Sequence, residues 1–403
     1  MDIIKLAVVF FLIVAAIKFK KPLHVAILAG TVGASILYDI NALQALQIMG
    51  AASISPDTIM LVLSFYSITF LQRMLEKREQ LTLAEQSLNG IFNSRRINAM
   101  MAPVIIGLLP SPGAVLIACP IVDNAGGNDI SKEDKTFIAS YFRHISEAFL
   151  PTYASIILAL QLSGVDMTAF VVSMLPMAVV LFLLGYFYYV RKIPKETGQP
   201  NSNKKLTHVK SLLRSIWTII ATIIIILTFK LQVHIAVSMI IILNFIIDRF
   251  TWEEIKPMFI SAFEYKLITS TIAIMMFKDI LTYTGVIDRL PEVFAVLPIP
   301  SVVIFALVFL LGTIVAGTQA IIALGIPLAF AAIPEGGVAL MVLLMCMTYI
   351  AMQVSPTHIC LAIVTERFET SFIDLVKRTV PVMFVFLVIL SGYSYILYLL
   401  QSL

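Results

Sequence analysis

Three ionisable side chains lie within five residues of one another in the stretch FRHISEAFLPTY, residues 142–153. Glu147 follows Arg143 by four positions, so a helix would place the two on one face as an ion pair. The planar guanidinium of Arg143 matches a carboxylate or a phosphate, and His144 and Glu147 can each exchange a proton. This spacing predicts a site for a small anionic molecule. The alternative is a purely structural Arg143–Glu147 pair that reaches toward water at a membrane boundary.

The chain around this cluster has the composition of a membrane protein. Of its 403 residues, 60% are hydrophobic and 13% are charged, whereas soluble domains carry about 25% charged residues. An unpaired charge at the centre of a bilayer costs about 2.5–3.5 kcal/mol, so the cluster must be paired or must face a water-filled cavity. The apolar runs predict an all-α polytopic protein with about ten transmembrane helices, near residues 3–17, 22–40, 57–75, 132–162, 166–190, 211–229, 233–248, 264–284, 337–364 and 379–400.

Two other apolar stretches, 98–125 and 301–332, are each about 30 residues long, too long for one straight crossing and too short for two. Each has a turn-forming centre, LPSPGA or AGTQA, so we interpret both as re-entrant helical hairpins. Polar groups at the tips could coordinate a substrate or a sodium ion, or could simply permit a tight turn. The candidates for binding are Ser111, Pro112, Gly113, Gly317, Thr318 and Gln319.

Lysine and arginine concentrate in the loops on one side of this arrangement, beginning with KFKK at 18–21. Because cytoplasmic loops carry an excess of these residues, we expect both termini outside and the hydrophilic linker 191–213 in the cytoplasm. The first apolar run lacks a cleavage site and a second follows at once, which predicts a retained span in the plasma membrane. The net charge of +4 reflects this distribution and is not a signal for nucleic-acid binding.

An internal repeat lies on either side of the linker. ISEAFLPTYASIILA aligns with IAMQVSPTHICLAIV, which places Pro151 over Pro356. SPGAVLIACPIV aligns with TQAIIALGIPLA in the same order. Each half has five expected crossings and one hairpin, and an odd number of crossings turns the second half upside down, as in many secondary transporters. The expected division is a first inverted repeat 1–190, a linker 191–213 and a second inverted repeat 214–403.

Each aligned proline lies in the middle of an expected span, 132–162 or 337–364. Proline removes a backbone donor and clashes with the preceding turn, so we predict that both spans are broken helices. A break exposes N–H groups, which attract anions, and C=O groups, which attract cations. The residues beside the prolines are therefore candidates for binding the substrate or an ion: Thr152, Ser355, Thr357 and His358.

A second interpretation stays open for several of these positions. His358 stands alone on an apolar face and could be a packing residue. Asp123 and Asn124, in VDNAGGND, could bind sodium together with Thr318 or could cap helices. The three cysteines have no metal-ligand spacing, and we interpret them as packing residues. Apart from sodium, no cofactor is expected.

The motifs LLPSPGA, FRHISEAFLPTY and QVSPTHICL resemble those of the ten-span membrane family called domain of unknown function 401. More broadly, paired hairpins that each precede a proline-broken helix resemble the ion transporter superfamily of dicarboxylate, citrate and gluconate carriers. This resemblance implies a scaffold domain, a transport domain that carries both hairpins, elevator-like movement and a homodimer. It supplies no substrate, because the close family has no assigned one. Dicarboxylate members of the superfamily typically have Ser-Asn-Thr at both tips, where this chain has SPG and GTQ, and this departure argues against dicarboxylate specificity and sodium coupling of that kind.

These patterns favour a secondary active transporter of a small anionic organic metabolite, coupled to sodium or protons. We expect no enzymatic activity, because the sequence has no HExxH, GxSxG or GxxxxGK[ST] motif. The alternatives are a channel, or an intramembrane enzyme that uses Arg143, His144 and Glu147. The expected partners are the small-molecule substrate, the lipid bilayer and a second copy of the chain.

Overall fold

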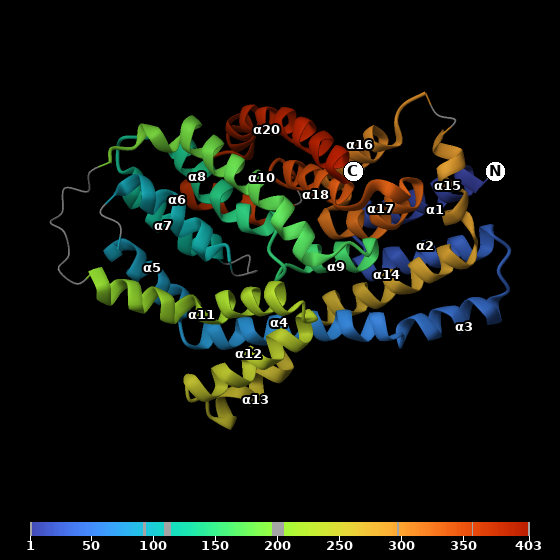
Figure 1. The fold of residues 1–403 in the computed structure, drawn as a ribbon, viewed down its shortest axis with the longest axis horizontal. Helices are drawn as coiled ribbons and strands as arrows, with labels where there is room; N and C mark the ends of the chain where they lie inside the picture. The colour runs from blue at the N-terminus through green and yellow to red at the C-terminus, as the bar shows by residue number, and fades with distance from the viewer. Residues whose placement is uncertain are drawn as a thin grey trace.

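The structure is a computed structural model that describes residues 2–91, 94–108, 114–195, 205–295, 298–356 and 358–401. Over these residues the chain forms helices and turns without a β-strand, which confirms the expected all-α fold class (Figure 1). The first half contains α1 Asp2–Lys18, α2 Leu23–Leu37, α3 Ala42–Ser53, α4 Pro56–Lys77, α5 Gln80–Ile91, α6 Arg95–Ile106, α7 Ala114–Gly126, α8 Lys132–Ile145, α9 Ala154–Ser163 and α10 Met167–Tyr188, with the short 3-10 turns η1 Ser146–Ala148 and η2 Val190–Lys192.

The second half consists of helices of 10 to 30 residues. It contains α11 Lys205–Phe229, α12 Val233–Ile247, α13 Trp252–Ser261, α14 Tyr265–Tyr283, α15 Val286–Ala295, α16 Ser301–Ala316, α17 Thr318–Ala332, α18 Gly337–Met352, α19 Ile359–Phe368 and α20 Phe372–Gln401, with the 3-10 turn η3 Pro334–Gly336.

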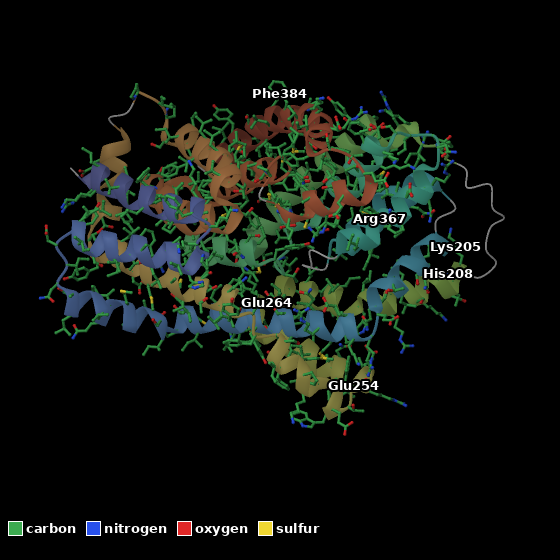
Figure 2. The ribbon with its side chains drawn as sticks, turned by 180° about the vertical axis from the view of Figure 1, so that it is seen from behind. Lys205, His208, Glu254, Glu264, Arg367 and Phe384 are labelled. Atoms are coloured by element: carbon green, nitrogen blue, oxygen red, sulfur yellow. The ribbon has the colours of Figure 1, made fainter. Side chains whose placement is uncertain are left out.

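Five helices of the described chain are long and apolar enough to cross a bilayer: α4, α10, α11, α18 with η3, and α20. A sixth candidate is α13 with α14, which are bent by 47° at the break between them. Large apolar side chains cover the outside, as at Phe384 of α20, which is 65% exposed and projects from the edge of the molecule (Figure 2). A soluble protein rarely exposes so much apolar surface, so this is a multi-pass membrane protein.

The expected count of ten crossings remains a prediction. Several of the expected spans are short helices, such as α2 and α12 with 15 residues each, which at about 1.5 Å per residue do not reach across a hydrocarbon core of about 30 Å. The structure also contains helices in segments where the hydropathy pattern predicts none, namely α3, α5, α13 and α15.

The helices form two layers (Figure 1). The lower layer in this view contains α2, α3, α4, α5, α11, α12 and α14, and α13 packs against α4 below it. The upper layer contains α6, α7, α8, α10 and α16 to α20. Helix α9 joins the layers, because it packs against α4 on one side and α17 on the other.

Two helices of the upper layer are buried along almost their whole length. Residues 134–145 of α8 and 339–352 of α18 are all buried, and both helices pack against α10 and α20. Each is followed by an interruption. Helix α8 ends at Ile145 and helix resumes at Ala154, with Pro151 in the gap. Helix α18 ends at Met352 and α19 begins at Ile359, with Pro356 in that gap.

The two hairpin stretches also contain paired helices. Helix α6 packs against α7, and α16 packs against α17. The second pair turns at Gly317, where φ is 86° and ψ is 162°, a backbone conformation that is essentially restricted to glycine. The tip of the first pair, residues 109–113, lies outside the described residues.

Candidate functional site

A cavity of about 450 Å³ lies where the two helix interruptions meet the turn at Gly317. Its wall comes from separate parts of the chain: the α1–α2 loop, the end of α8, and the starts of α9, α17 and α19. Seven of the residues predicted from the sequence line it: Arg143, Glu147, Gly317, Thr318, Gln319, Ser355 and His358.

Arg143 and Glu147 form an ion pair in the wall of this cavity. Nη1 of Arg143 lies 2.9 Å from Oε2 of Glu147, with side-chain exposures of 3% and 18%. The four-residue spacing brings them together across the junction of α8 and η1. The guanidinium is therefore almost fully buried, while the carboxylate of Glu147 is partly exposed.

Three helices begin at the cavity and direct their positive dipole ends toward it. The first residues of α9, α17 and α19 all line the wall, and none of these helices has a side-chain cap on its first N–H groups. Uncapped N–H groups and the helix dipole both favour a bound anion. The cavity wall carries two positive side chains, Arg143 and Lys21, and one carboxylate, Glu147. This excess of positive charge also favours a negative ligand.

The end of α6 is in direct contact with this region. The hydroxyl of Tyr153 donates to the carbonyl of Gly107, the residue that ends α6. A Cβ added at Gly107 would lie 2.2 Å from the carbonyl oxygen of Arg143, so only glycine fits between the two backbones. The first helix pair is therefore packed directly against the backbone that carries the guanidinium.

His144 lies behind the cavity wall and contacts His358 from the other half of the chain. Their Nε2 atoms are 2.9 Å apart. Nδ1 of His144 lies 2.6 Å from the carbonyl oxygen of Ser140, which can only accept, so Nδ1 carries the proton. Nε2 of His144 then accepts a hydrogen bond from Nε2–H of His358 when both rings are neutral. The pair is mostly buried, with His144 fully so.

Some predicted residues lie elsewhere. Thr152 is buried beside Leu108 and Thr222, in a separate small space against α11, and does not line the cavity. Asp123 pairs with Lys135, with 2.7 Å between carboxylate oxygen and Nζ, and it does not line the cavity with Thr318. Outside the described residues are Ser111, Pro112, Gly113 and Thr357.

The structure adds residues that the sequence analysis did not select. From the sequence, Lys21 is only a marker of the cytoplasmic side and Cys360 only a packing residue, but both line the cavity. Tyr153, Ser155 and Thr313 also line the cavity. Cys360 follows His358 by two positions, but one such pair is too little to indicate a site in the sequence without the fold that brings other residues beside it.

Comparisons with known proteins agree with the fold. A family model described as "Protein of unknown function (DUF401)" matches residues 3–399. No curated protein matches the chain. Among solved structures, the chain is similar to the Alcanivorax borkumensis YdaH transporter, whose crystal structure reveals an unusual topology: 12% of residues are identical, 89% of each chain is covered, and the TM-score is 0.56. At this identity the likeness shows a shared fold.

Proposed function

The chain belongs to the DUF401 family, whose function is unknown, and we propose that it is a secondary active transporter of a small anionic organic metabolite. The observation that carries this proposal is the convergence of one buried guanidinium and three helix N-termini on a single cavity. Interrupted helices around a polar cavity are how many secondary transporters hold their substrates. The likeness in fold to a protein named as a transporter supports the same function.

The cavity suits a small carboxylate or phosphate ester. Its volume of about 450 Å³ falls within the range of about 300–1,000 Å³ that small-molecule sites occupy. A substrate carboxylate would bind the guanidinium of Arg143 in competition with Glu147. Glu147, once released, could take up a proton or join oxygen ligands around a sodium ion. Binding of the anion and binding of the coupling cation would then favour each other.

The two layers suggest how access could alternate. In this proposal the lower layer is the scaffold, and the upper layer, with both helix pairs and the cavity, moves relative to it in an elevator-like manner. The protein would act as a homodimer in the plasma membrane, with both termini outside and residues 191–213 in the cytoplasm. The inverted repeats would supply the two alternative conformations.

A thermal-shift screen of organic acids with and without sodium, followed by uptake into proteoliposomes, tests this function. A ligand of the native state raises apparent stability. The variant Arg143→Lys keeps the charge but loses the planar fork, so we expect uptake to fall by at least about 100-fold. Arg367→Lys, at the end of α19 and away from the cavity wall, is the matched control and should transport normally (Figure 2). Uptake by Arg143→Lys equal to that of the control would contradict the proposal.

A further inference from the structure

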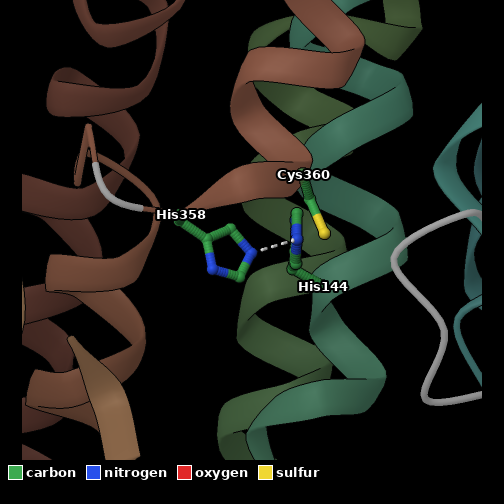
Figure 3. A group of neighbouring side chains, drawn as sticks. All are labelled: His144, His358 and Cys360. Carbon is green, nitrogen blue, oxygen red and sulfur yellow. Dashed lines mark hydrogen bonds between the residues drawn. The ribbon is translucent and has the colours of Figure 1, made fainter. Parts of the chain in front are cut away.

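We propose that His144, His358 and Cys360 form a binding site for one transition-metal ion of the zinc class. The three side chains come from α8 and from the start of α19, and they lie next to one another (Figure 3). The site does not depend on the protein being a transporter, because it rests on the positions of three ligand atoms. None of these residues was expected from its sequence spacing to bind a metal.

The distances are close to those that a metal ion requires. The three ligand atoms, a ring nitrogen of each histidine and Sγ of Cys360, all lie within 4.8 Å of one another. In a tetrahedral zinc site the ligand atoms lie about 3.3–3.6 Å apart, given about 2.0–2.1 Å from metal to nitrogen and about 2.3 Å to sulfur. The Nε2 atoms, now 2.9 Å apart, would separate by about 0.5 Å, and the sulfur, within 4.8 Å of both nitrogens, would approach by at most about 1.3 Å.

His144 is oriented as a metal ligand would be. Its Nδ1–H is held by the carbonyl of Ser140 at 2.6 Å, so its Nε2 lone pair is directed at His358 and away from the helix backbone. Histidine ligands to metals almost always donate the other ring N–H to such an acceptor, which fixes the tautomer and the ring orientation. This contact is independent of the cluster itself and supports the same assignment.

The ligand set selects the kind of ion. Two imidazoles and one thiolate suit zinc or copper(I), whereas sodium, magnesium and calcium prefer oxygen ligands. On binding a divalent ion, the Cys360 thiol loses one proton to solvent, and the Nε2 proton of His358 moves to its Nδ1. The thiolate leaves the ion with one net positive charge, and the nearby Arg143–Glu147 pair is neutral overall, so that positive charge is available to an anion.

Three protein ligands leave a fourth position open, as in catalytic zinc sites. His358 and Cys360 both line the cavity, so the open position faces the space in which an anion would bind. The ion would also connect α8 in the first half of the chain to α19 in the second. Its binding should therefore raise the thermal stability of the whole chain by mass action.

Cobalt titration of the tag-free, full-length protein in detergent tests this site after treatment with a chelator. We expect one cobalt(II) ion per chain, with a strong thiolate-to-cobalt charge-transfer absorption that zinc displaces. Cys360→Ser should abolish that absorption. His144→Ala and His358→Ala should each weaken cobalt binding by at least about tenfold, because each removes one of three ligands.

Two variants serve as matched controls. Cys346 is a buried thiol that contacts Met174, and His234 lies on α12. Cys346→Ser and His234→Ala should leave the absorption unchanged.

The absence of a thiolate absorption, or its survival in Cys360→Ser, would overturn the proposal. If His144→Ala fails to fold, Cys360→Ser still decides the question, because serine is similar in size. Loss of anion uptake alone would not bear on the metal site, and loss of cobalt binding would not bear on transport.

Discussion

Helices α8 and α18 precede the two interruptions and are buried to a similar degree, but their side chains are of opposite kinds. The sequence of α8, KEDKTFIASYFRHI, has six charged or histidine side chains, whereas GVALMVLLMCMTYIAM of α18 has none. The two most buried charges of α8 are paired: Asp134 lies 2.8 Å from Lys192 and 3.2 Å from Arg378, and Arg143 contacts Glu147. Both helices are followed by an interruption that contains one of the aligned prolines. The guanidinium that lines the cavity comes only from the first half. The second half supplies two helix N-termini and a histidine.

The largest expected loss of stability is in α18, where packing is purely apolar. Leu344 is fully buried, so Leu344→Ala should lower the free energy of unfolding by about 2–5 kcal/mol. The loss should not change with salt concentration, because no charge is involved. Leu183→Ala on α10, where the side chain is 49% exposed, is the control and should cost much less. Denaturant titration in detergent measures both, and equal losses would contradict the comparison.

In α8 the corresponding change removes a charge. Asp134→Ala leaves Lys192 and Arg378 without this partner, but their side chains are 45% and 37% exposed and can turn to water. We therefore expect a loss of about 2 kcal/mol, below the 3–5 kcal/mol of a fully buried pair. Unlike the loss at Leu344, it should shrink at high salt. Asp288→Ala, at an exposed position of α15, is the control. A loss independent of salt would show that Asp134 acts through packing alone.

A smaller effect is expected at the turn that directs α17 toward the cavity. No atom lies within 4 Å of a Cβ added at Gly317, so Gly317→Ala would be strained only through its backbone, at about 1–2 kcal/mol. Because relief of that strain would redirect the N-terminus of α17, anion binding should weaken as well. Gly164, with φ of 70° and equally open surroundings, is the matched control: alanine there should reduce stability but not binding. Unchanged anion binding in Gly317→Ala would show that the N-terminus of α17 does not contribute to the binding site.

The smallest effect concerns pH. Lys132 at the start of α8 donates to Glu369 at the end of α19 at 2.7 Å, and this hydrogen bond lowers the pKa of the Glu369 carboxyl. Because the folded pKa lies below the unfolded value of about 4.3, the stabilisation is present above that pH and is lost as the pH falls through the folded pKa. Glu369→Gln should therefore lower the Tm slightly at about pH 7 and not at about pH 3. Glu335→Gln, at an exposed position, is the control, and an equal difference at both pH values would contradict this assignment.

The parts of the site that depend on local spacing could be predicted from the sequence. The Arg143–Glu147 pair follows from a four-residue separation, and the turn at Gly317 follows from AGTQA between two apolar runs. Hydropathy did not reveal helices such as α3 and α5, because they are short and have polar faces. The contact between His144 and His358 joins residues 214 positions apart, and no local pattern reports such a distance. The prediction that Thr152 lines the site was wrong, because a side chain in a turn can point toward the cavity or away from it, and here it points toward α11.

The absence of a side chain at Gly107 has a mechanical consequence. Where α6 ends against the carbonyl of Arg143, there is no rotatable group between the two backbones to absorb a shift. A displacement of α6 by a fraction of an atomic diameter must then be matched by α8. The end of the first helix pair and the backbone that carries the guanidinium therefore move as one body.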